Sequence, residues 1–258
     1  MNDVYLLERG SLRQSFDQAA ATYDSAASLQ RKAAKHLLSK LDRSLSPQVA
    51  LDLGCGTGHA GTLFVQRFPL TRFLYTDLAF SMARQAAEGG LAICADANAL
   101  PFADACVDLL WSNLMMQWCN DLPHTFAQMH AVCRPGATLA FSTFGPATLQ
   151  ELRNSFDDGY THVNRFVAAH EIEAQLETAG FAGVQLESQR RVVHYAEVLV
   201  LMRELKFLGA NNATSGRARG LTGRHRWRQM IARYERLRSG AGLPATYELI
   251  FVIARKRN

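Results

Sequence analysis

Short apolar runs alternate along the chain with segments in which apolar residues recur every three or four positions. The runs have the character of buried β-strands, whereas the segments between them have the spacing of amphipathic helices. The predicted strands of this region are residues 49–53, 73–76, 91–95, 107–112 and 138–144. Of the helices predicted between these strands, the first ends at residue 67, and two others cover residues 80–88 and 122–132. Because parallel strands need such crossover helices, the alternation predicts an α/β protein with a parallel sheet and helices on both faces.

Helical spacing also precedes this region, and two more strands follow it. Residues 11–41 predict one or two N-terminal helices, and residues 168–179 predict a helix that ends at Gly180. Residues 184–193 and 246–255 predict the last two strands. The sequence between these two strands is mostly helical and basic, which predicts an insertion that acts as a lid.

These elements predict three parts. A helical cap of residues 1–45 precedes a core of residues 46–195 and 244–258, and a basic helical insertion of residues 196–243 interrupts that core. A chain of 258 residues is long enough for an elaborated α/β domain with a sizeable core.

The composition fits a folded protein in a reducing compartment. Hydrophobic residues make up 48% of the chain and charged residues 20%, and no run approaches the roughly 18 apolar residues of a membrane span. The five cysteines include no CxxC pair, and the first residues lack the apolar stretch of a secretory signal. We therefore expect a cytoplasmic protein with no membrane span and no disulfide framework.

The positive charge is concentrated in one segment. The formal net charge is +5, yet residues 203–238 alone carry ten basic and two acidic residues, so the rest of the chain is mildly acidic. Such a segment predicts an anionic partner, either nucleic acid, an anionic membrane surface or an acidic protein. A solvated, arginine-rich helical face is the alternative interpretation.

A glycine-rich turn follows the first predicted strand and opens a helix. Residues 49–58 read VALDLGCGTG, so backbone can approach a ligand closely at Gly54, Gly56 and Gly58, and Cys55 would face that ligand through its backbone. The same region also fits the weak dinucleotide pattern GxGxxG. Asp52 argues against a dinucleotide, because its carboxylate would repel a pyrophosphate and favour a cationic ligand with an amino group.

Two further carboxylates follow the second and third predicted strands. Asp77 ends the second strand, where a carboxylate can accept hydrogen bonds from both hydroxyls of a ribose. Asp96, followed by Ala97 and Asn98, ends the third and can accept from an adenine amino group. With Asp52 these residues predict one nucleoside cleft, and a chance set of helix N-caps is the alternative.

The motifs LDLGCGTG, TD, AD and DLLWSN, taken together, resemble the motif series of class I S-adenosylmethionine-dependent methyltransferases over about residues 45–145. This resemblance implies a Rossmann-like fold with a mostly parallel seven-stranded sheet and an antiparallel last strand. It also implies S-adenosylmethionine as cofactor. The residues expected at the cofactor are Tyr23, Asp52, Gly54, Cys55, Gly56, Gly58, Asp77, Leu78, Met82, Asp96, Ala97, Asn98, Ser112 and Asn113.

Further segments extend the resemblance over nearly the whole chain. The pattern FxxxAxxYD at residues 16–24, with LQR, SNLMMQWC, NRF and MRELKFLG further along, resembles the malonyl-[acyl-carrier protein] O-methyltransferases of biotin synthesis. The resemblance implies that Tyr23 closes over the cofactor, with a core aromatic as the alternative. It also implies methylation of the free malonyl carboxylate to give the ester used as a biotin precursor, with an acidic acyl carrier protein as partner.

The acceptor pocket is expected just after the fourth strand, at Gln117 and Trp118, although core packing is an alternative for the tryptophan. A carboxylate acceptor is already ionised at pH 7 and needs no general base, so no catalytic acid or base is predicted. A cation would orient it, and Arg165 and Arg203 are the candidates, each with a surface ion pair as the alternative. The eight histidines show no metal-ligand spacing, so no metal site is expected.

Three other functions stay open from the sequence. A methyltransferase for tRNA or rRNA would use the basic segment, but the chain lacks an RNA-binding module, so nucleic acid is not the expected partner. A methyltransferase for another small carboxylate is the second alternative. A non-catalytic protein that retains the nucleoside cleft is the third.

Overall fold

The computed structural model describes residues 6–156, 160, 162–210 and 224–257. Their strands form one seven-stranded sheet in the order β3-β2-β1-β4-β5-β7-β6. The strands are β1 (Val49–Leu53), β2 (Arg72–Asp77), β3 (Leu91–Cys94), β4 (Val107–Asn113), β5 (Cys133–Phe144), β6 (Phe181–Tyr195) and β7 (Leu243–Lys256). The pairs among β1 to β5 are parallel, whereas β7 is antiparallel to both β5 and β6. The expected mostly parallel sheet with an antiparallel last strand is therefore confirmed.

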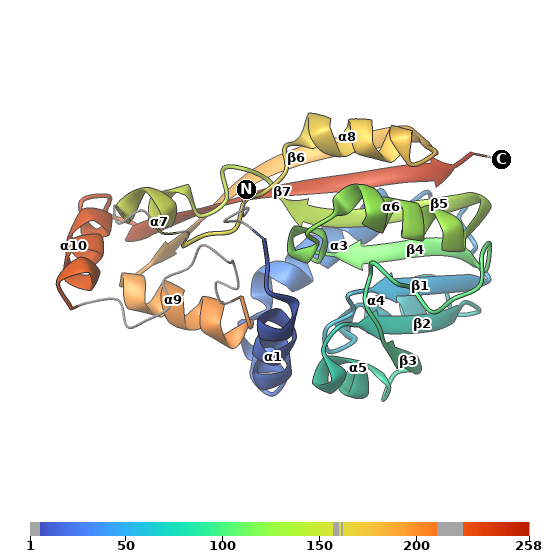
Figure 1. Cartoon of the computed structure of the whole chain (residues 1–258), viewed down its shortest axis with the longest axis horizontal. Helices are drawn as coiled ribbons and strands as arrows, with labels where there is room; N and C mark the ends of the chain where they lie inside the picture. Colours follow the sequence, from blue (N-terminus) through green and yellow to red (C-terminus); the bar gives the residue numbers. More distant parts are fainter. Residues whose placement is uncertain (1–5, 157–159, 161, 211–223, 258) are drawn as a thin grey trace.

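The helices are α1 (Arg9–Ala19), α2 (Tyr23–Ala26), α3 (Ser28–Lys40), α4 (His59–Arg67), α5 (Phe80–Ala86), α6 (Leu122–Val132), α7 (Gln150–Ser155), α8 (Ala169–Thr178), α9 (Val198–Phe207) and α10 (Arg224–Glu235), with a short 3-10 helix η1 (Met116–Trp118). Figure 1 shows the sheet on one side of the molecule, α7, α9 and α10 on the other, and α1 between them.

Two apolar layers hold helices on opposite faces of the sheet. Side chains of α6 and α8 pack with Leu51 and Leu110 on one face. Side chains of α3 and α4 pack with Ala50 and Leu109 on the other. Neighbouring residues of a strand point to opposite faces, so the nearly continuous apolar sequence of β1 and β4 is the expected signature of a sheet covered on both sides.

A second apolar centre lies away from the sheet core. The antiparallel pairing of β6 and β7 continues through residues 191–195 and 243–247. There the ribbon packs with α7, α9 and α10 in a cluster that contains Leu152, Leu201 and Tyr234. We call these three helices and this end of the ribbon the lobe. Figure 1 shows β6 and β7 leading into it.

The structure differs from the sequence-based expectation in several places. The N-terminal region holds three helices, α7 was not predicted, and β5, β6 and β7 are longer than predicted. The six residues of α7 are too few to carry a periodic pattern, and contacts from distant residues hold it, such as the Glu151 carboxylate accepting the Thr246 N–H. The lobe therefore includes residues of the predicted core, and the expected three-part division stays a prediction.

Gly58 provides a test of the turn that leads into α4. Its φ is +83°, and a Cβ there would lie 2.9 Å from the Cα of Ala86. Gly58→Ala should lower the free energy of unfolding by about 1–3 kcal/mol, because both backbones resist moving. The matched control is Gly10→Ala in α1, where a Cβ meets nothing within 4 Å, and this variant should be neutral or stabilised by up to about 1 kcal/mol. Equal urea midpoints for the two variants would contradict this account.

Candidate functional site

The glycine-rich turn after β1 lies against the end of β2. The N–H groups of Gly54 and Cys55 both donate to the carbonyl of Thr76, at 2.8 and 3.0 Å. Gly54 has a φ of +73°, and a Cβ there would lie 2.2 Å from Cγ of Met115. Only glycine fits a position that combines this backbone with so close an approach. The turn is thus held at the carboxyl edge of the sheet, where open α/β sheets bind ligands.

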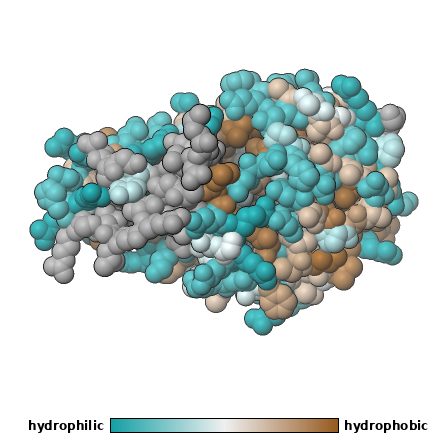
Figure 2. Space-filling model, viewed as in Figure 1, coloured by the Kyte–Doolittle hydropathy of each residue, from teal (hydrophilic) through white to brown (hydrophobic). Residues whose placement is uncertain are grey.

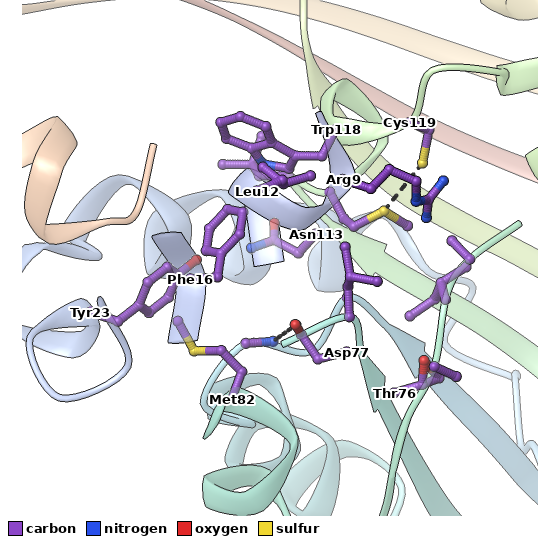
Figure 3. A pocket seen from close by; sticks show the side chains of 18 residues that line it. Arg9, Leu12, Phe16, Tyr23, Thr76, Asp77, Met82, Asn113, Trp118 and Cys119 are labelled. Carbon is purple, nitrogen blue, oxygen red and sulfur yellow. Dashed lines mark hydrogen bonds between the residues drawn. The ribbon is translucent and has the colours of Figure 1, made fainter. Parts of the chain in front are cut away.

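A cavity of about 690 Å³ opens beside this turn. Its lining comes from the ends of β1, β2, β3 and β4 and from α1, α2 and η1. The predicted cofactor residues that line it are Tyr23, Gly54, Gly56, Asp77, Leu78, Met82, Ala97 and Asn113. Figure 3 shows the rings of Trp118, Phe16 and Tyr23 along one side and Asp77 across from them. We call this the smaller cavity.

Asp77 has both carboxylate oxygens tied to backbone. Oδ2 accepts the N–H of Gly56 and Oδ1 accepts that of Ala79, each at 2.9 Å. Burial raises the pKa of Asp77 to about 6, although these hydrogen bonds partly offset the shift. Each oxygen keeps a further lone pair, so the carboxylate can still accept from hydroxyl groups in the cavity.

Asp52 does not line the smaller cavity. It lines an adjacent recess of about 420 Å³, which shares Tyr23, Gly54 and Asn113 with that cavity. Its side chain is buried, and Oδ2 has no hydrogen-bond partner among the described residues. Burial, and next the nearby charge of Asp77, raise the pKa of Asp52 to about 8. A carboxylate held this way gains strongly from a cationic or hydrogen-bond-donating ligand.

Four of the predicted cofactor residues have structural partners instead of facing the smaller cavity. Asp96 forms an ion pair with Arg9 and accepts the N–H of Asn98. The Asn98 side chain accepts from Thr125, and buried Ser112 donates to the carbonyl of Leu53. Gly58 is the N-cap residue before α4 and lies against Ala86. The remaining predicted residue, Cys55, lines the recess beside Asp52. Strand-end position does not reveal these partners, because they come from elements distant in sequence.

The N-terminal helices cover the smaller cavity. Phe16 of α1 packs edge-on against Trp118, with ring centroids 5.3 Å apart. Asp17 accepts the backbone N–H of Ser81, and Arg9 reaches the loop after β3 through Asp96. Tyr23 lines the cavity, and burial raises its pKa further above the ordinary value, so its hydroxyl is neutral. The sequence did not identify Arg9 or Phe16 as site residues, because on a helix their spacing signals only packing.

A larger and mostly apolar cavity adjoins the smaller one. It holds about 1190 Å³ and is lined by α7, α9, the segment between α7 and α8, and the residues around η1. Phe16, Tyr23, Leu114 and Trp118 line both cavities and form their shared wall. Figure 2 shows hydrophobic residues gathered near the centre of a largely hydrophilic face. The two cavities could hold one ligand each, in contact at the shared wall, with the ligand of the larger cavity in mostly apolar surroundings.

The polar lining of the larger cavity differs from the expectation. Gln117, one of the two residues expected at the acceptor pocket, lines it. Gln30, which was not predicted, also lines it, and its buried Oε1 has no hydrogen-bond partner among the described residues. Arg165 and Arg203 are exposed and do not line it. Among the residues that the structure describes, the charged side chains of its lining are Glu204 and Lys206, with His162 as a further titratable group. Because both side chains are exposed, their guanidinium groups remain hydrated. Neither arginine lies at the wall that the two cavities share.

The described residues form no metal site and no membrane span. No group of three or more histidine, cysteine, aspartate or glutamate side chains there could hold a metal ion. Within the same residues, no helix has the length and apolar character needed to cross a bilayer.

The buried carboxylate of Asp52 makes the stability of the ligand-free protein depend on pH. Because its folded pKa is raised to about 8, the folded state keeps a proton between about pH 4 and 8 that the unfolded state releases. Stability is therefore lost as the pH rises through this window. Asp52→Asn removes this titration, so the variant does not lose this stability as the pH rises. Its free energy of unfolding, minus that of the parent, should therefore be larger at pH 8.5 than at pH 5, on the order of a few kcal/mol. Urea unfolding at the two pH values measures the change, and a pH-independent difference would contradict it.

Comparisons with known proteins agree with this geometry. The family described as a methyltransferase domain matches residues 51–141. The chain is 43% identical to the malonyl-[acyl-carrier protein] O-methyltransferase of Methylovorus sp. (strain MP688), over 96% of this chain and 89% of that protein. Two solved structures share the fold. The YcgJ protein of Bacillus subtilis has a TM-score of 0.64 at 15% identity and covers 88% of this chain and 99% of its own.

The second structure is phosphoethanolamine N-methyltransferase 2 of Haemonchus contortus in complex with S-adenosyl-L-methionine. It has a TM-score of 0.59 at 15% identity and covers 94% of this chain and 57% of its own. A sequence identity of 15% supports a shared fold and nothing more. The 43% identity to the Methylovorus protein extends over nearly the whole chain and therefore shows the family. The chain therefore belongs to the malonyl-[acyl-carrier protein] O-methyltransferases, within the class I methyltransferase fold.

Proposed function

We propose that this chain transfers the methyl group of S-adenosylmethionine to the free carboxylate of a malonyl-[acyl-carrier protein]. The observation that carries the proposal is the pair of cavities that meet at Phe16, Tyr23, Leu114 and Trp118. One is lined by a glycine-rich turn and a carboxylate, and the other is large and mostly apolar. The similarity to the Methylovorus enzyme supports the substrate, and the Haemonchus complex supports the cofactor.

The smaller cavity and its recess fit S-adenosylmethionine by charge. The unpartnered Oδ2 of Asp52 would be compensated by a cationic amino group, and Asp77 would accept from the ribose hydroxyls. Met82, Leu78 and Ala97 give the cavity an apolar side against which an adenine ring can pack. When bound, the cofactor supplies a methyl group on a positively charged sulfur.

The chain's own contribution to the reaction is placement and exclusion of water. An acceptor oxygen forms a bond to the methyl carbon while the carbon–sulfur bond breaks, and that electron pair stays on sulfur. A positive and a negative group thus become a neutral thioether and a neutral ester, and no proton moves. Low polarity favours such a reaction, which suits the apolar larger cavity and requires no general base. The aromatic wall of Phe16, Tyr23 and Trp118 would keep water from the line of transfer.

The carrier protein would dock on the lobe. Helix α9 carries Arg203 and Lys206, both exposed, and Lys206 also lines the larger cavity. On α10, Arg226 and Arg228 are exposed. Arg236 and Arg238, just after α10, are exposed as well, and Arg233 of α10 is half-buried. Arg217 and Arg219 lie outside the described residues, as does the side chain of Arg224. An acidic carrier attracted to this surface would place the end of a flexible arm at the cavity.

The cofactor assignment predicts a specific loss at Asp77. Asp77→Ala removes two charge-assisted hydrogen bonds to ribose, so the affinity for S-adenosylhomocysteine should fall at least about thirtyfold, or about 2 kcal/mol. Isothermal titration calorimetry measures it. The control is Asp104→Ala, which removes a carboxylate from an exposed loop position. This variant should bind S-adenosylhomocysteine with the affinity of the parent. Parental affinity in a folded Asp77→Ala variant would remove Asp77 from the cofactor site.

The substrate assignment predicts which acceptor gains a radiolabelled methyl group. We expect label on malonyl-carrier protein and on malonyl-CoA but not on transfer RNA. For the carrier-bound substrate, kcat/KM should fall steeply as salt is raised above 0.1 M, where the Debye length is about 10 Å. Label on RNA alone would favour the RNA methyltransferase alternative.

Charge reversal separates docking from acceptor binding. Arg203→Glu with Arg228→Glu should raise KM for the carrier-bound substrate at least about tenfold and affect malonyl-CoA less. The matched control reverses Arg43 and Arg72, which are exposed beside the start of β1 and at the start of β2, the opposite edge of the sheet. Equal losses with carrier and CoA substrates would instead assign Arg203 or Arg228 to the acceptor itself.

A further inference from the structure

A strained turn lies where the two cavities meet. Leu114, between β4 and η1, has a φ of +53°, a left-handed conformation that leucine rarely adopts. Its N–H donates to both the carbonyl and the hydroxyl oxygen of Ser142, at 3.0 and 3.1 Å. Because Leu114 is buried and lines both cavities, this conformation sets the backbone of their shared wall. Strain of this kind persists where surrounding contacts hold it and clusters at functional sites.

The carbonyl of Leu114 is covered by one side chain. Gln117 donates from Nε2 to this carbonyl oxygen at 2.5 Å, and its Oε1 accepts from the hydroxyl of buried Thr143 at 3.1 Å. A backbone carbonyl only accepts hydrogen bonds, so the nitrogen of the amide must face it, and the orientation of the amide is fixed. Nε2 carries a second N–H, and Gln117 lines the larger cavity.

This arrangement changes what the wall offers to an acceptor. An uncovered carbonyl oxygen would attract the N–H of an amine or the O–H of an alcohol and would repel a carboxylate. With Gln117 in place, an amide N–H is available beside Leu114 instead. The wall therefore attracts a carboxylate and disfavours an amine. Specificity then comes both from an attractive contact with the correct acceptor and from a repulsive contact with the wrong one.

A neutral donor also suits the reaction better than an arginine does. The acceptor is an anion before the transfer and a neutral ester after it, so its charge diminishes in the transition state. A guanidinium would stabilise the ionised acceptor more than the transition state and would slow the transfer. An amide N–H also orients the carboxylate, but because it carries no charge it stabilises the ionised acceptor less and slows the transfer less. The exposed positions of Arg165 and Arg203, away from the cavity lining, agree with this reasoning.

We propose that Gln117, fixed by Thr143, is the residue that selects and orients the acceptor carboxylate, by covering the Leu114 carbonyl and presenting an N–H to the larger cavity. This inference rests on the proposed carboxylate methylation. It assigns Gln117 direct contact with the acceptor and Thr143 a positioning role.

The test replaces the amide by a group of nearly the same size. Gln117→Glu sets a carboxylate against the Leu114 carbonyl and the acceptor, so kcat/KM for a malonyl thioester at pH 8 should fall at least about thirtyfold. Affinity for S-adenosylhomocysteine should stay within about twofold, because Gln117 does not line the smaller cavity. The introduced carboxyl is half-buried beside a carbonyl oxygen, which raises its pKa, and its protonated form can donate to Leu114 again. The deficit relative to the parent should therefore shrink as the pH is lowered to 5.5.

Thr143 supplies a second pair of variants that does not depend on the first. Thr143→Val removes the hydroxyl that fixes the Gln117 amide and should raise KM for the malonyl thioester at least about fivefold. Thr143→Ser keeps the hydroxyl and should restore KM to within about twofold of the parent. Parental kcat/KM in Gln117→Glu, or equal KM values in the valine and serine variants, would overturn the assignment. A parent enzyme that methylates no malonyl thioester would overturn the proposed function as well, which distinguishes the two failures.

Discussion

The approach of the glycine-rich turn to the end of β2 is the constraint on which the site depends. The carbonyl of Thr76 accepts two N–H groups from this turn, and the neighbouring carboxylate of Asp77 accepts a third, from Gly56. These bonds leave no room for a side chain at Gly54, which lies against Met115 after β4. One turn therefore joins the ends of β1, β2 and β4 and sets the floor of the smaller cavity. Asp52 is buried and Asp77 is half-buried as a consequence, and this removal from water raises the pKa of both carboxyl groups.

The second cavity depends on a different part of the chain. Its walls come from the lobe, where the β6–β7 ribbon carries α7 and α9 away from the sheet core. Helix α1 links the two regions, because Phe16 packs on Trp118 and also lies within 2.9 Å of the position a Cβ would take on Gly209, after α9. The polar contacts of Arg9 and Asp17 tie the same helix to the loops around β3 and α5. Movement of α1 would therefore open both cavities together.

The distribution of charge is consistent with a reaction in which charge disappears. Asp77 is half-buried at the smaller cavity and Asp52 is buried at the adjoining recess. The larger cavity is mostly apolar, and exposed basic side chains lie on α9 and α10. A cation deep in the larger cavity would stabilise an ionised acceptor before the transfer, whereas basic residues on the surface act only on the approach of an acidic partner. Arg203, Arg226 and Arg228 of the lobe thus stay out of both cavity linings, whereas Lys206 of α9 lies at the larger cavity.

The sequence by itself determined the α/β fold with its mostly parallel sheet, the glycine-rich turn and the position of Asp77 at a strand end. Those features are local, because strand alternation, crossover helices and glycine spacing are written within a few neighbouring residues. Only the tertiary structure decided which strand-end side chains face the cavity. Asp96 and Asn98 follow a strand as Asp77 does, yet Arg9 and Thr125, distant in sequence, engage them. It also decided that Arg165 and Arg203 lie outside the lining of the larger cavity, whereas Gln117, whose place after the fourth strand the sequence indicated, lines it. The direction of a side chain depends on partners brought together by folding, and the spacing of residues along one chain does not record those partners.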